Sequence, residues 1–374
     1  MADADVRIPT GLLPKDGRFN SGPSKVRPAT VEALAATERS YLGTSHRRTG
    51  VRSTVARVRE GLRDLFSLPD GYEVLLGNGG SSLFWDAATF GLIQDRSQHL
   101  VFGEFSAKFA QAAAATPHLA EPEIIETEPG THPSLRFNAA VDVYAATHNE
   151  TSTGVVMPIE RPAGATAQQL VVVDGTSAAG GVRVDPTQFD AYYFAPQKCF
   201  AGDGGLWLAL CSPAAVERIA TLGVSGRWTP AMLSLPLALE NSRLDQTYNT
   251  PALATIFMLA DQIDWMLGLG GLDAVANRCD TSATILYGWA DAHPLARPFV
   301  ESPAARSPVT GTIDFDDSVD AAWLAATLRS NGVIDTEPYR KLGRNQLRIA
   351  MFPAIDPEDV AAVTRCIDFL LDAR

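Results

Sequence analysis

The fold is decided by the stretch Ala191-Tyr192-Tyr193-Phe194-Ala195-Pro196-Gln197-Lys198. Its first residues form a continuous apolar run, which is typical of a strand that is buried on both faces. A lysine ends the stretch, and the glycine-rich turn Gly202-Asp203-Gly204-Gly205 follows it. A lysine desolvated at such a place has a lowered pKa and can form a Schiff base as a nucleophile. Taken alone, Lys198 is more often an ordinary solvated loop residue.

Similar short apolar runs occur on both sides of this strand, and amphipathic stretches lie between them. The alternation predicts an α/β domain in which a mixed, mostly parallel sheet is sandwiched by helices. The predicted strands are Glu73–Leu76, His99–Phe102, Val143–Ala146, Leu170–Val173, Ala191–Phe194 and Leu206–Leu210. The predicted helices are Ala29–Leu42, Thr54–Phe66, Ser82–Leu92, Ser106–Ala115, Pro213–Leu222 and Pro251–Leu267.

After about residue 267 the pattern changes to that of a small α+β unit. It predicts a helix Leu272–Ala290, a strand Thr310–Phe315, a helix Val319–Asn331, a strand Gln346–Ala350 and a helix Asp356–Asp372. We therefore expect an N-terminal arm over residues 1–22, a large domain over 23–265 and a small C-terminal domain over 266–374. A length of 374 residues agrees with two domains, because single cores stop growing at roughly 250–300 residues.

Charge and cysteine usage exclude several functions. The formal net charge of -12 disfavours nucleic acid and anionic membrane surfaces as partners. We find no apolar run of the roughly 20 residues that a membrane helix needs and no apolar leader at the N-terminus, so we expect a cytoplasmic protein. The four cysteines are scattered without a CxxC pair, so we expect no metal site. Basic clusters on this acidic background are informative about anionic ligands.

Two further strand ends carry polar residues. Asp174 follows the apolar run Leu170–Val173, at the edge where open α/β sheets bind ligands. It could pair with a pyridinium nitrogen or merely cap a turn, and the two readings are about even. In Gly79-Gly80-Ser81-Ser82 a strand runs into a helix whose first N–H groups could hold a phosphate, although a plain turn is the commoner reading.

The basic residues form two clusters. Ser45-His46-Arg47-Arg48 is the densest in the first half of the chain, and it could bind a carboxylate or phosphate or simply be a solvated patch. The second cluster comprises Arg340, Lys341 and Arg344, with Arg348 inside an apolar strand. A charge that interrupts an apolar strand suggests a carboxylate ligand for Arg348.

These stretches together resemble the phosphoserine aminotransferases, which are class V members of the fold type I pyridoxal phosphate enzymes. The resemblance covers nearly the whole chain. It is carried by Phe19-Asn20-Ser21-Gly22-Pro23, Ser45-His46-Arg47, Gly79-Gly80-Ser81-Ser82, Asn149-Glu150-Thr151, Asp174, Ala195-Pro196-Gln197-Lys198, Tyr248-Asn249-Thr250-Pro251 and Leu347-Arg348.

The resemblance implies pyridoxal 5'-phosphate as cofactor and a homodimer with shared active sites. Lys198 would carry the Schiff base and Asp174 would pair with the ring nitrogen. Phe105 would stack on the ring, and Thr151 would bond on the side of the ring hydroxyl. The cofactor phosphate would be held by Ser81, Ser82 and Gln197, joined by Asn249 and Thr250 of the other subunit.

For the substrates, the resemblance implies that His46 and Arg47 receive the distal anionic group and Arg348 the α-carboxylate. The reaction would exchange the amino group between O-phospho-L-serine with 2-oxoglutarate and 3-phosphooxypyruvate with glutamate, in serine biosynthesis, with 4-phosphooxy-L-threonine of pyridoxine biosynthesis as a further substrate. Alternatives are an alanine–glyoxylate or serine–pyruvate aminotransferase, which would not need His46 and Arg47, and a catalytically silent member of the fold.

Two departures from the family pattern matter. Phe105 stands where relatives often have tryptophan, and Ser81-Ser82 stands where many have Gly-Arg. The missing arginine leads to the hypothesis that Arg340, Lys341 or Arg344 supplies the positive charge for the substrate phosphate.

Overall fold

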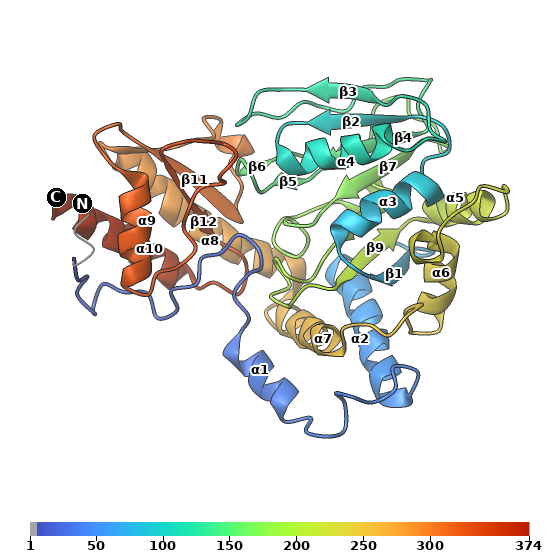
Figure 1. Ribbon diagram of the computed structural model, residues 1–374, viewed down its shortest axis with the longest axis horizontal. Coiled ribbons are helices and arrows are strands. Elements are labelled where there is room, and N and C mark those ends of the chain that lie inside the picture. Colours follow the sequence, from blue (N-terminus) through green and yellow to red (C-terminus); the bar gives the residue numbers. More distant parts are fainter. Residues whose placement is uncertain (1–5, 374) are drawn as a thin grey trace.

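The computed structural model describes residues 6–373 and has a large and a small lobe side by side (Figure 1). The large lobe is built on a seven-stranded sheet in the order β1-β9-β8-β7-β4-β2-β3. Only β9 runs antiparallel to its neighbours, so the expectation of a mixed, mostly parallel sheet is confirmed. Its strands are β1 (Glu73–Asn78), β2 (Ser97–Val101), β3 (Glu123–Glu126), β4 (Val143–Thr147), β7 (Leu170–Asp174), β8 (Ala191–Phe194) and β9 (Leu206–Cys211).

Helices cover both faces of this sheet, which explains why its strands read as continuous apolar runs. Alternate residues of one strand enter different cores: Val172 packs with α3, α4, α5 and α6, whereas Val171 and Val173 pack with α2 and α7. These helices are α2 (Thr49–Leu65), α3 (Ser81–Gly91), α4 (Glu104–Ala114), α5 (Pro213–Gly223), α6 (Leu235–Arg243) and α7 (Leu253–Gly268).

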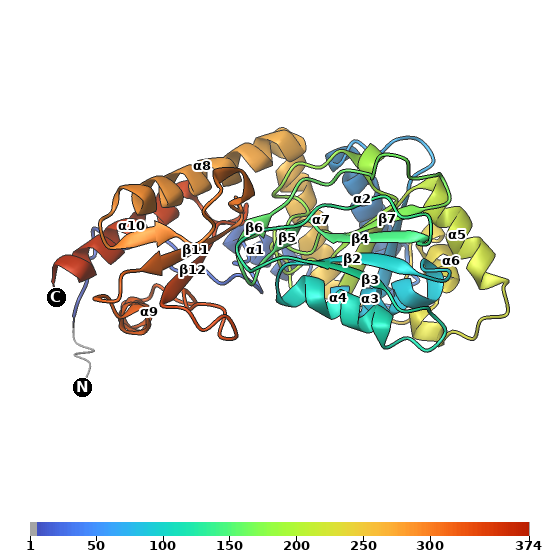
Figure 2. The same cartoon turned by 90° about the horizontal axis from the view of Figure 1, so that it is seen from above.

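The small lobe is an antiparallel sheet with helices against it. Its order is β10 (Ala296–Pro298), β11 (Thr310–Phe315) and β12 (Gln346–Ala350), with α9 (Ala321–Ser330) and α10 (Pro357–Asp372) in the same core. The long helix α8 (Gly271–Ala292) extends from one lobe to the other (Figure 2). Its residue Val275 belongs to a core of the large lobe and Cys279 to the core of the small one.

The N-terminal segment packs into the small lobe. Ile8 and Phe19 belong to its core, and Phe19 exchanges backbone hydrogen bonds with Ile334 and Ala350. The limits expected for the arm and the two domains stay predictions, and residues 1–5 of the arm lie outside the described residues. No helix within 6–373 combines the length and apolar character needed to cross a membrane.

Some expected elements differ from those observed. The helix expected over Ala29–Leu42 is wrong in extent, because α1 runs only over Pro28–Ala35. The side chains of Thr37 and Ser40 bond nearby carbonyls, and Glu38 adopts a left-handed backbone with φ 47°, so turns replace the helix. The sequence pattern also missed β3, α6, β10 and the short pair β5 (Asn149–Glu150) and β6 (Val155–Val156).

Candidate active site

A cavity of about 170 Å³ lies at the carboxyl ends of the central strands. It is lined by seven of the residues expected at a cofactor site, which come from α3, α4, the turn after β5 and the ends of β7 and β8: Ser81, Ser82, Phe105, Thr151, Asp174, Gln197 and Lys198. Because parallel strands end at one edge of the sheet, residues that lie far apart in the sequence meet there.

Lys198 points from the turn after β8 toward the N-terminal arm. Its ammonium group donates a hydrogen bond to the carbonyl of Ser21, and Nζ lies 5.8 Å from the centre of the Phe105 ring. Burial, with a smaller contribution from the positive charge of Arg348, lowers the pKa of Lys198 to about 8. At pH 7 roughly a tenth of this amine is therefore neutral and nucleophilic, far more than for an ordinary lysine.

Asp174 ends β7 and is buried, with 3% of the residue exposed. One oxygen accepts a hydrogen bond from the backbone N–H of Thr176 at 2.9 Å, and the other accepts from the indole Nε1 of Trp85 at 3.0 Å. Burial raises the pKa of Asp174, while these donors lower it. Trp85 and Thr176 line the cavity too, and the sequence reasoning missed both.

The start of α3 has the features of an anion-binding site. Gly80 precedes the helix and has no side chain to cap it, so the first N–H groups face the cavity end. Ser81 Oγ accepts a hydrogen bond from the Thr176 hydroxyl at 2.7 Å. Asn149 also lines the cavity, and its buried Oδ1 and the buried Oε1 of Gln197 have no partner among the described residues. Such buried polar atoms are expected where a ligand binds.

Helix α4 is fixed at its start by a distant carboxylate. Glu150 is fully buried, and its Oε2 accepts hydrogen bonds from the backbone N–H groups of Phe105 and Ser106 at 3.0 and 2.9 Å. Its Oε1 accepts from the N–H and the hydroxyl of Ser152. The hydroxyl of Ser152 in turn accepts from the N–H of Glu104 at 3.1 Å. The segment around Thr151 and the Phe105 ring are thereby held relative to one another.

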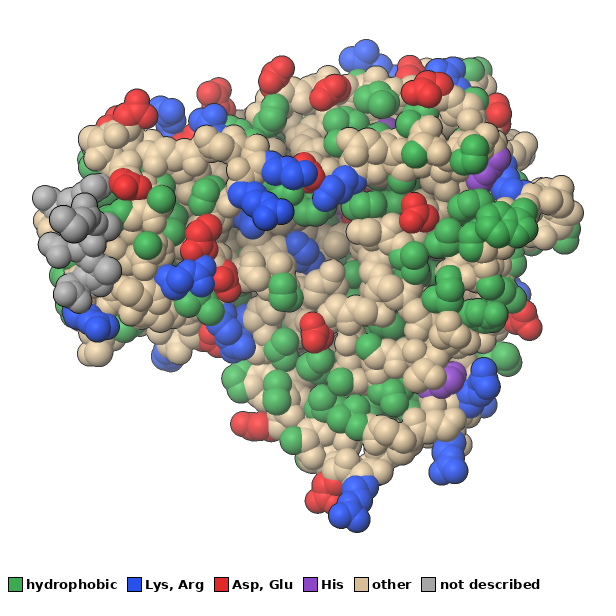
Figure 3. All heavy atoms as spheres, viewed as in Figure 1, with side chains coloured by type: hydrophobic (Ala, Val, Ile, Leu, Met, Phe, Trp, Pro, Cys, Tyr) green, Lys and Arg blue, Asp and Glu red, His purple; other side chains and the backbone are tan. Residues whose placement is uncertain are grey.

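Arg348 reaches this region from the small lobe. Its guanidinium donates to the backbone carbonyl of Thr151 at 3.3 Å and lies over the Tyr339 ring at 5.5 Å. Tyr339 in turn packs on Phe105, with 6.1 Å between the ring centres. Figure 3 shows basic side chains gathered at the hollow between the lobes. The structure thus brings Arg348 to the edge of the site.

Four of the expected residues form a separate group within this chain. The hydroxyl of Thr250 lies 3.3 Å from Nδ1 of the partly buried His46, next to the exposed Arg47 and Asn249. None of the four lines the cavity that contains Lys198. Burial, followed by the charge of Arg47, lowers the pKa of His46.

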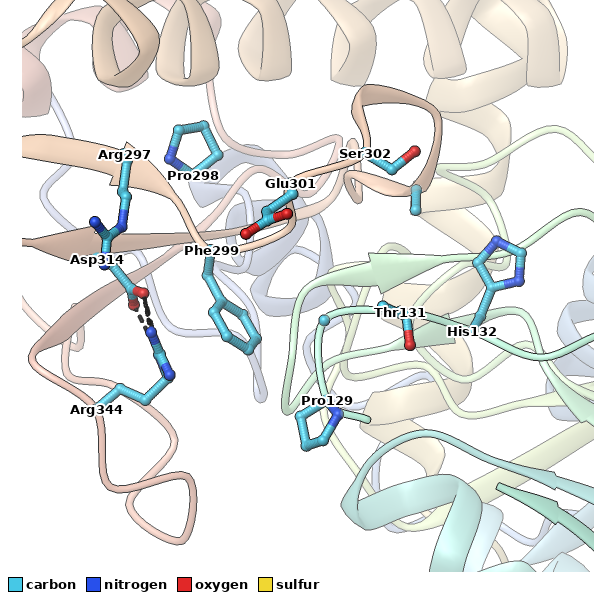
Figure 4. A pocket seen from close by; sticks show the side chains of 12 residues that line it. Pro129, Thr131, His132, Arg297, Pro298, Phe299, Glu301, Ser302, Asp314 and Arg344 are labelled. Atoms are coloured by element: carbon cyan, nitrogen blue, oxygen red, sulfur yellow. Dashed lines mark hydrogen bonds and ion pairs between the residues drawn. The ribbon is translucent and has the colours of Figure 1, made fainter. Parts of the chain in front are cut away.

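The three candidates for the missing phosphate-binding charge are placed differently. Lys341 pairs with Glu104 at 2.5 Å. Arg344 pairs with the buried Asp314 and lines another cavity, of about 810 Å³ between the lobes, where Figure 4 shows the two side chains turned toward each other. Arg340 is exposed, beside Tyr339.

Comparison with known proteins fits this geometry. The family model "Aminotransferase class-V" matches residues 18–336. The chain belongs to the class-V aminotransferases. This class-V aminotransferase is 60% identical to a phosphoserine aminotransferase from Nocardioides sp. over 373 residues, which cover 100% of both chains. It is 58% identical to one from Rhodococcus jostii over 97% of each chain. The expected resemblance is confirmed.

Solved structures agree on the fold. A phosphoserine aminotransferase from Cytophaga hutchinsonii superimposes with a TM-score of 0.86 at 24% identity, over 95% of this class-V aminotransferase and 99% of that chain. Family membership implies pyridoxal phosphate as cofactor. The residues present fit this group, because the open helix start, a buried carboxylate, a lysine with a lowered pKa and unpartnered Gln197 Oε1 surround one cavity.

Proposed function

We propose that this aminotransferase exchanges the amino group between O-phospho-L-serine with 2-oxoglutarate and 3-phosphooxypyruvate with glutamate, in serine biosynthesis. The observation that carries the proposal is that Lys198 lies close to Phe105, Asp174 and Arg348 of the small lobe. The chain that has this arrangement also has full-length relatives named phosphoserine aminotransferase. We extend the substrate class to 4-phosphooxy-L-threonine, which has the same phosphate and α-amino acid ends.

In this proposal the cofactor lies in the 170 Å³ cavity. Ser81, Ser82 and Gln197 hold its phosphate, Asp174 faces its ring nitrogen, and Phe105 and Thr151 contact the ring. When bound, pyridoxal phosphate supplies the carbonyl that takes up the amino group and a ring that withdraws electrons from the reacting carbon.

The chain itself orients the substrate and moves the proton. Lys198 would hold the cofactor before substrate binds, and its side-chain amine, once free, would act as the general base that takes the proton from the substrate Cα. A pKa of about 8 suits both roles near neutral pH. Arg348 binds the α-carboxylate, which fixes the Cα–H bond near Lys198. Such orientation can contribute several kcal/mol, up to roughly 7–11 kcal/mol in the best intramolecular cases.

We also propose that two copies form the site together. His46, Arg47, Asn249 and Thr250 lie outside the cavity of their own chain, so they would act at the site of the partner. Support comes from exposed apolar side chains beside Asn249, since Tyr248 is 41% exposed and Met232, whose sulfur contacts the Asn249 amide, is 39% exposed. Location in the cytoplasm agrees with four free, buried cysteines.

A half-reaction experiment tests the activity. The purified enzyme, loaded with cofactor, is mixed with phosphoserine, serine or alanine, and the visible absorbance of the cofactor is followed. We expect a rapid shift with phosphoserine and a far slower one with serine and alanine. A faster shift with alanine or serine would instead favour the alanine–glyoxylate or serine–pyruvate alternative, and no shift with any of them would refute an aminotransferase of this group.

A complementation experiment tests the shared site. Lys198→Ala and Asn249→Ala chains are co-expressed with different tags, and the mixed dimer is purified. If Asn249 acts across the interface, one of the two sites in each mixed dimer is intact, and the activity is about half that of the wild-type dimer. If Asn249 acts within its own chain, the mixed dimer is no more active than the two variants alone.

A further inference from the structure

The side chain of Trp85 connects two parts of the candidate site that the sequence motifs treat separately. Trp85 lies in α3 with 8% of its surface exposed, and its Nε1 donates to Asp174 Oδ2 at 3.0 Å. The N–H of Thr176 donates to Oδ1 at 2.9 Å. Each carboxylate oxygen therefore accepts from a donor in a fixed position, and the hydroxyl groups of Thr176 and Tyr193 also interact with this carboxylate. An indole N–H can only donate, so it favours the acceptor form of the carboxylate.

The same helix carries the phosphate end of the site. Trp85 follows Ser81 by four residues, so both lie on one face of α3, about one turn apart. Thr176 closes a ring of contacts, because its hydroxyl donates to Ser81 Oγ at 2.7 Å while its N–H bonds Asp174. The carboxylate that faces the ring nitrogen and the helix that binds the phosphate are thus held together by Trp85 and Thr176.

A second tryptophan of the same core shows how this role differs from simple packing. Trp207, in β9, is 2% exposed and packs in the same core as Trp85. Its ring meets Phe84 edge to face, at 5.0 Å between centres, but its Nε1 has no partner among the described residues. Trp207 therefore contributes through packing alone, whereas the indole N–H of Trp85 donates a hydrogen bond to Asp174.

We propose that Trp85 is a positioning residue that holds Asp174 in the orientation and ionised form needed to meet the ring nitrogen of pyridoxal phosphate. The proposal rests on the function proposed above. Trp85 acts through Asp174, and it adds no step to the reaction. Loss of its N–H should weaken the contact between Asp174 and the cofactor while the rest of the cavity stays in place.

The test compares Trp85→Phe with Trp207→Phe in the full chain. The dissociation constant of pyridoxal phosphate from each apo-enzyme, the visible circular dichroism of the bound cofactor, kcat and KM for phosphoserine, and the urea midpoint are measured. A hydrogen bond to a charged group contributes about 1.5–3 kcal/mol, which corresponds to a roughly 10- to 150-fold change in an equilibrium constant.

For Trp85→Phe we expect the dissociation constant of pyridoxal phosphate to rise by about 10- to 150-fold. We also expect an altered dichroism band and a lower kcat with little change in KM. For Trp207→Phe we expect a lower urea midpoint, with no change in the dissociation constant of pyridoxal phosphate or in the dichroism of the bound cofactor. The proposal is overturned if Trp85→Phe keeps the wild-type dissociation constant of pyridoxal phosphate and the wild-type dichroism. It is also overturned if the two variants change this constant and the dichroism to the same extent.

A second replacement guards against misfolding of Trp85→Phe. 3-Benzothienylalanine at position 85 keeps the two-ring shape and puts sulfur in place of the N–H, and it should give the same cofactor effects without loss of stability. Wild-type behaviour of that protein also overturns the proposal. Cofactor binding is measured without substrate. A failure of the wild type to use phosphoserine would therefore refute the proposed function, and the effect of the Trp85 variants on cofactor binding could still be interpreted.

Discussion

The substitution Glu150→Gln tests how the start of α4 is held in the site. Five hydrogen-bond donors converge on the buried carboxylate, two or more on each oxygen: the N–H and hydroxyl groups of Ser106 and Ser152 and the N–H of Phe105. A glutamine has the same shape but only one oxygen. Its amide group must therefore face donors on one side, which leaves at least one buried N–H without an acceptor.

The expected loss of stability follows from these contacts. An unsatisfied buried donor costs about 1–3 kcal/mol. The lost negative charge at the helix N-terminus adds about 0.3–1 kcal/mol, and the relief of burying a charge offsets part of the sum. We therefore expect the free energy of unfolding to fall by about 1–3 kcal/mol in urea titrations at pH 7. Cofactor affinity should fall as well, because the N–H of Phe105 is one of the groups released.

Glu104→Gln is the matched control, because it changes the same residue type at the same helix start. Among residues 6–373, Glu104 forms ion pairs with Lys341 and Lys108 alone, near the surface, and such pairs contribute about 0–1 kcal/mol. A Glu150→Gln protein that is as stable as the Glu104→Gln protein and binds the cofactor like the wild type would refute the role assigned to Glu150.

Three further predictions concern the charged groups of the site. The rate at which apo-enzyme captures pyridoxal phosphate should rise with pH around a midpoint of about 8, because only the neutral Lys198 amine reacts, and stopped-flow absorbance measures it. Arg348→Met should move this midpoint upward, because the Arg348 charge lowers the pKa of Lys198; an unchanged midpoint would show that Arg348 does not contribute to the lowered pKa. Arg340→Ala should raise KM for phosphoserine about tenfold or more if Arg340 contacts the phosphate. Arg344→Ala, which breaks the pair with Asp314, should instead lower the urea midpoint and leave KM unchanged; equal KM values for both variants and the wild type would exclude both arginines from phosphate binding.

The strands of the large sheet could be predicted from the sequence because burial on both faces makes them mostly apolar, and the run at Ala191–Phe194 coincides with β8. The segments Thr310–Phe315 and Gln346–Ala350 coincide with β11 and β12, although Asp314 and Arg348 interrupt their apolar pattern. β3 was missed because it is an edge strand, whose residues from Glu123 to Glu126 alternate between partly buried and exposed and begin and end with glutamate. An edge strand packs against one neighbour only and so carries a weaker apolar signal.

The site was predictable only where its residues belong to local motifs. Lys198 and Asp174 stand at strand ends, so the sheet topology brings them together. The bond from Trp85 to Asp174 spans 89 residues, and that from Phe105 to Glu150 spans 45. No spacing in the sequence marks such contacts, because they depend on how α3 and α4 pack on the sheet. Within the motif Asn149-Glu150-Thr151, the resemblance to the family assigns a role to Thr151 and none to Glu150.

The difference between the two helix starts supports the proposal that α3, and not α4, holds the phosphate. Both α3 and α4 follow a strand of the large sheet and begin after a glycine without a capping side chain. At α4, a Cβ on Gly103 would lie 2.4 Å from Cγ of Glu150, because that carboxylate already fills the anion position. At α3, a Cβ on Gly80 would meet nothing within 4 Å. Of these two helix N-termini, the open one is thus the one beside Lys198 and Asp174, and we propose that a negatively charged group of a ligand would take there the place that Glu150 takes at α4.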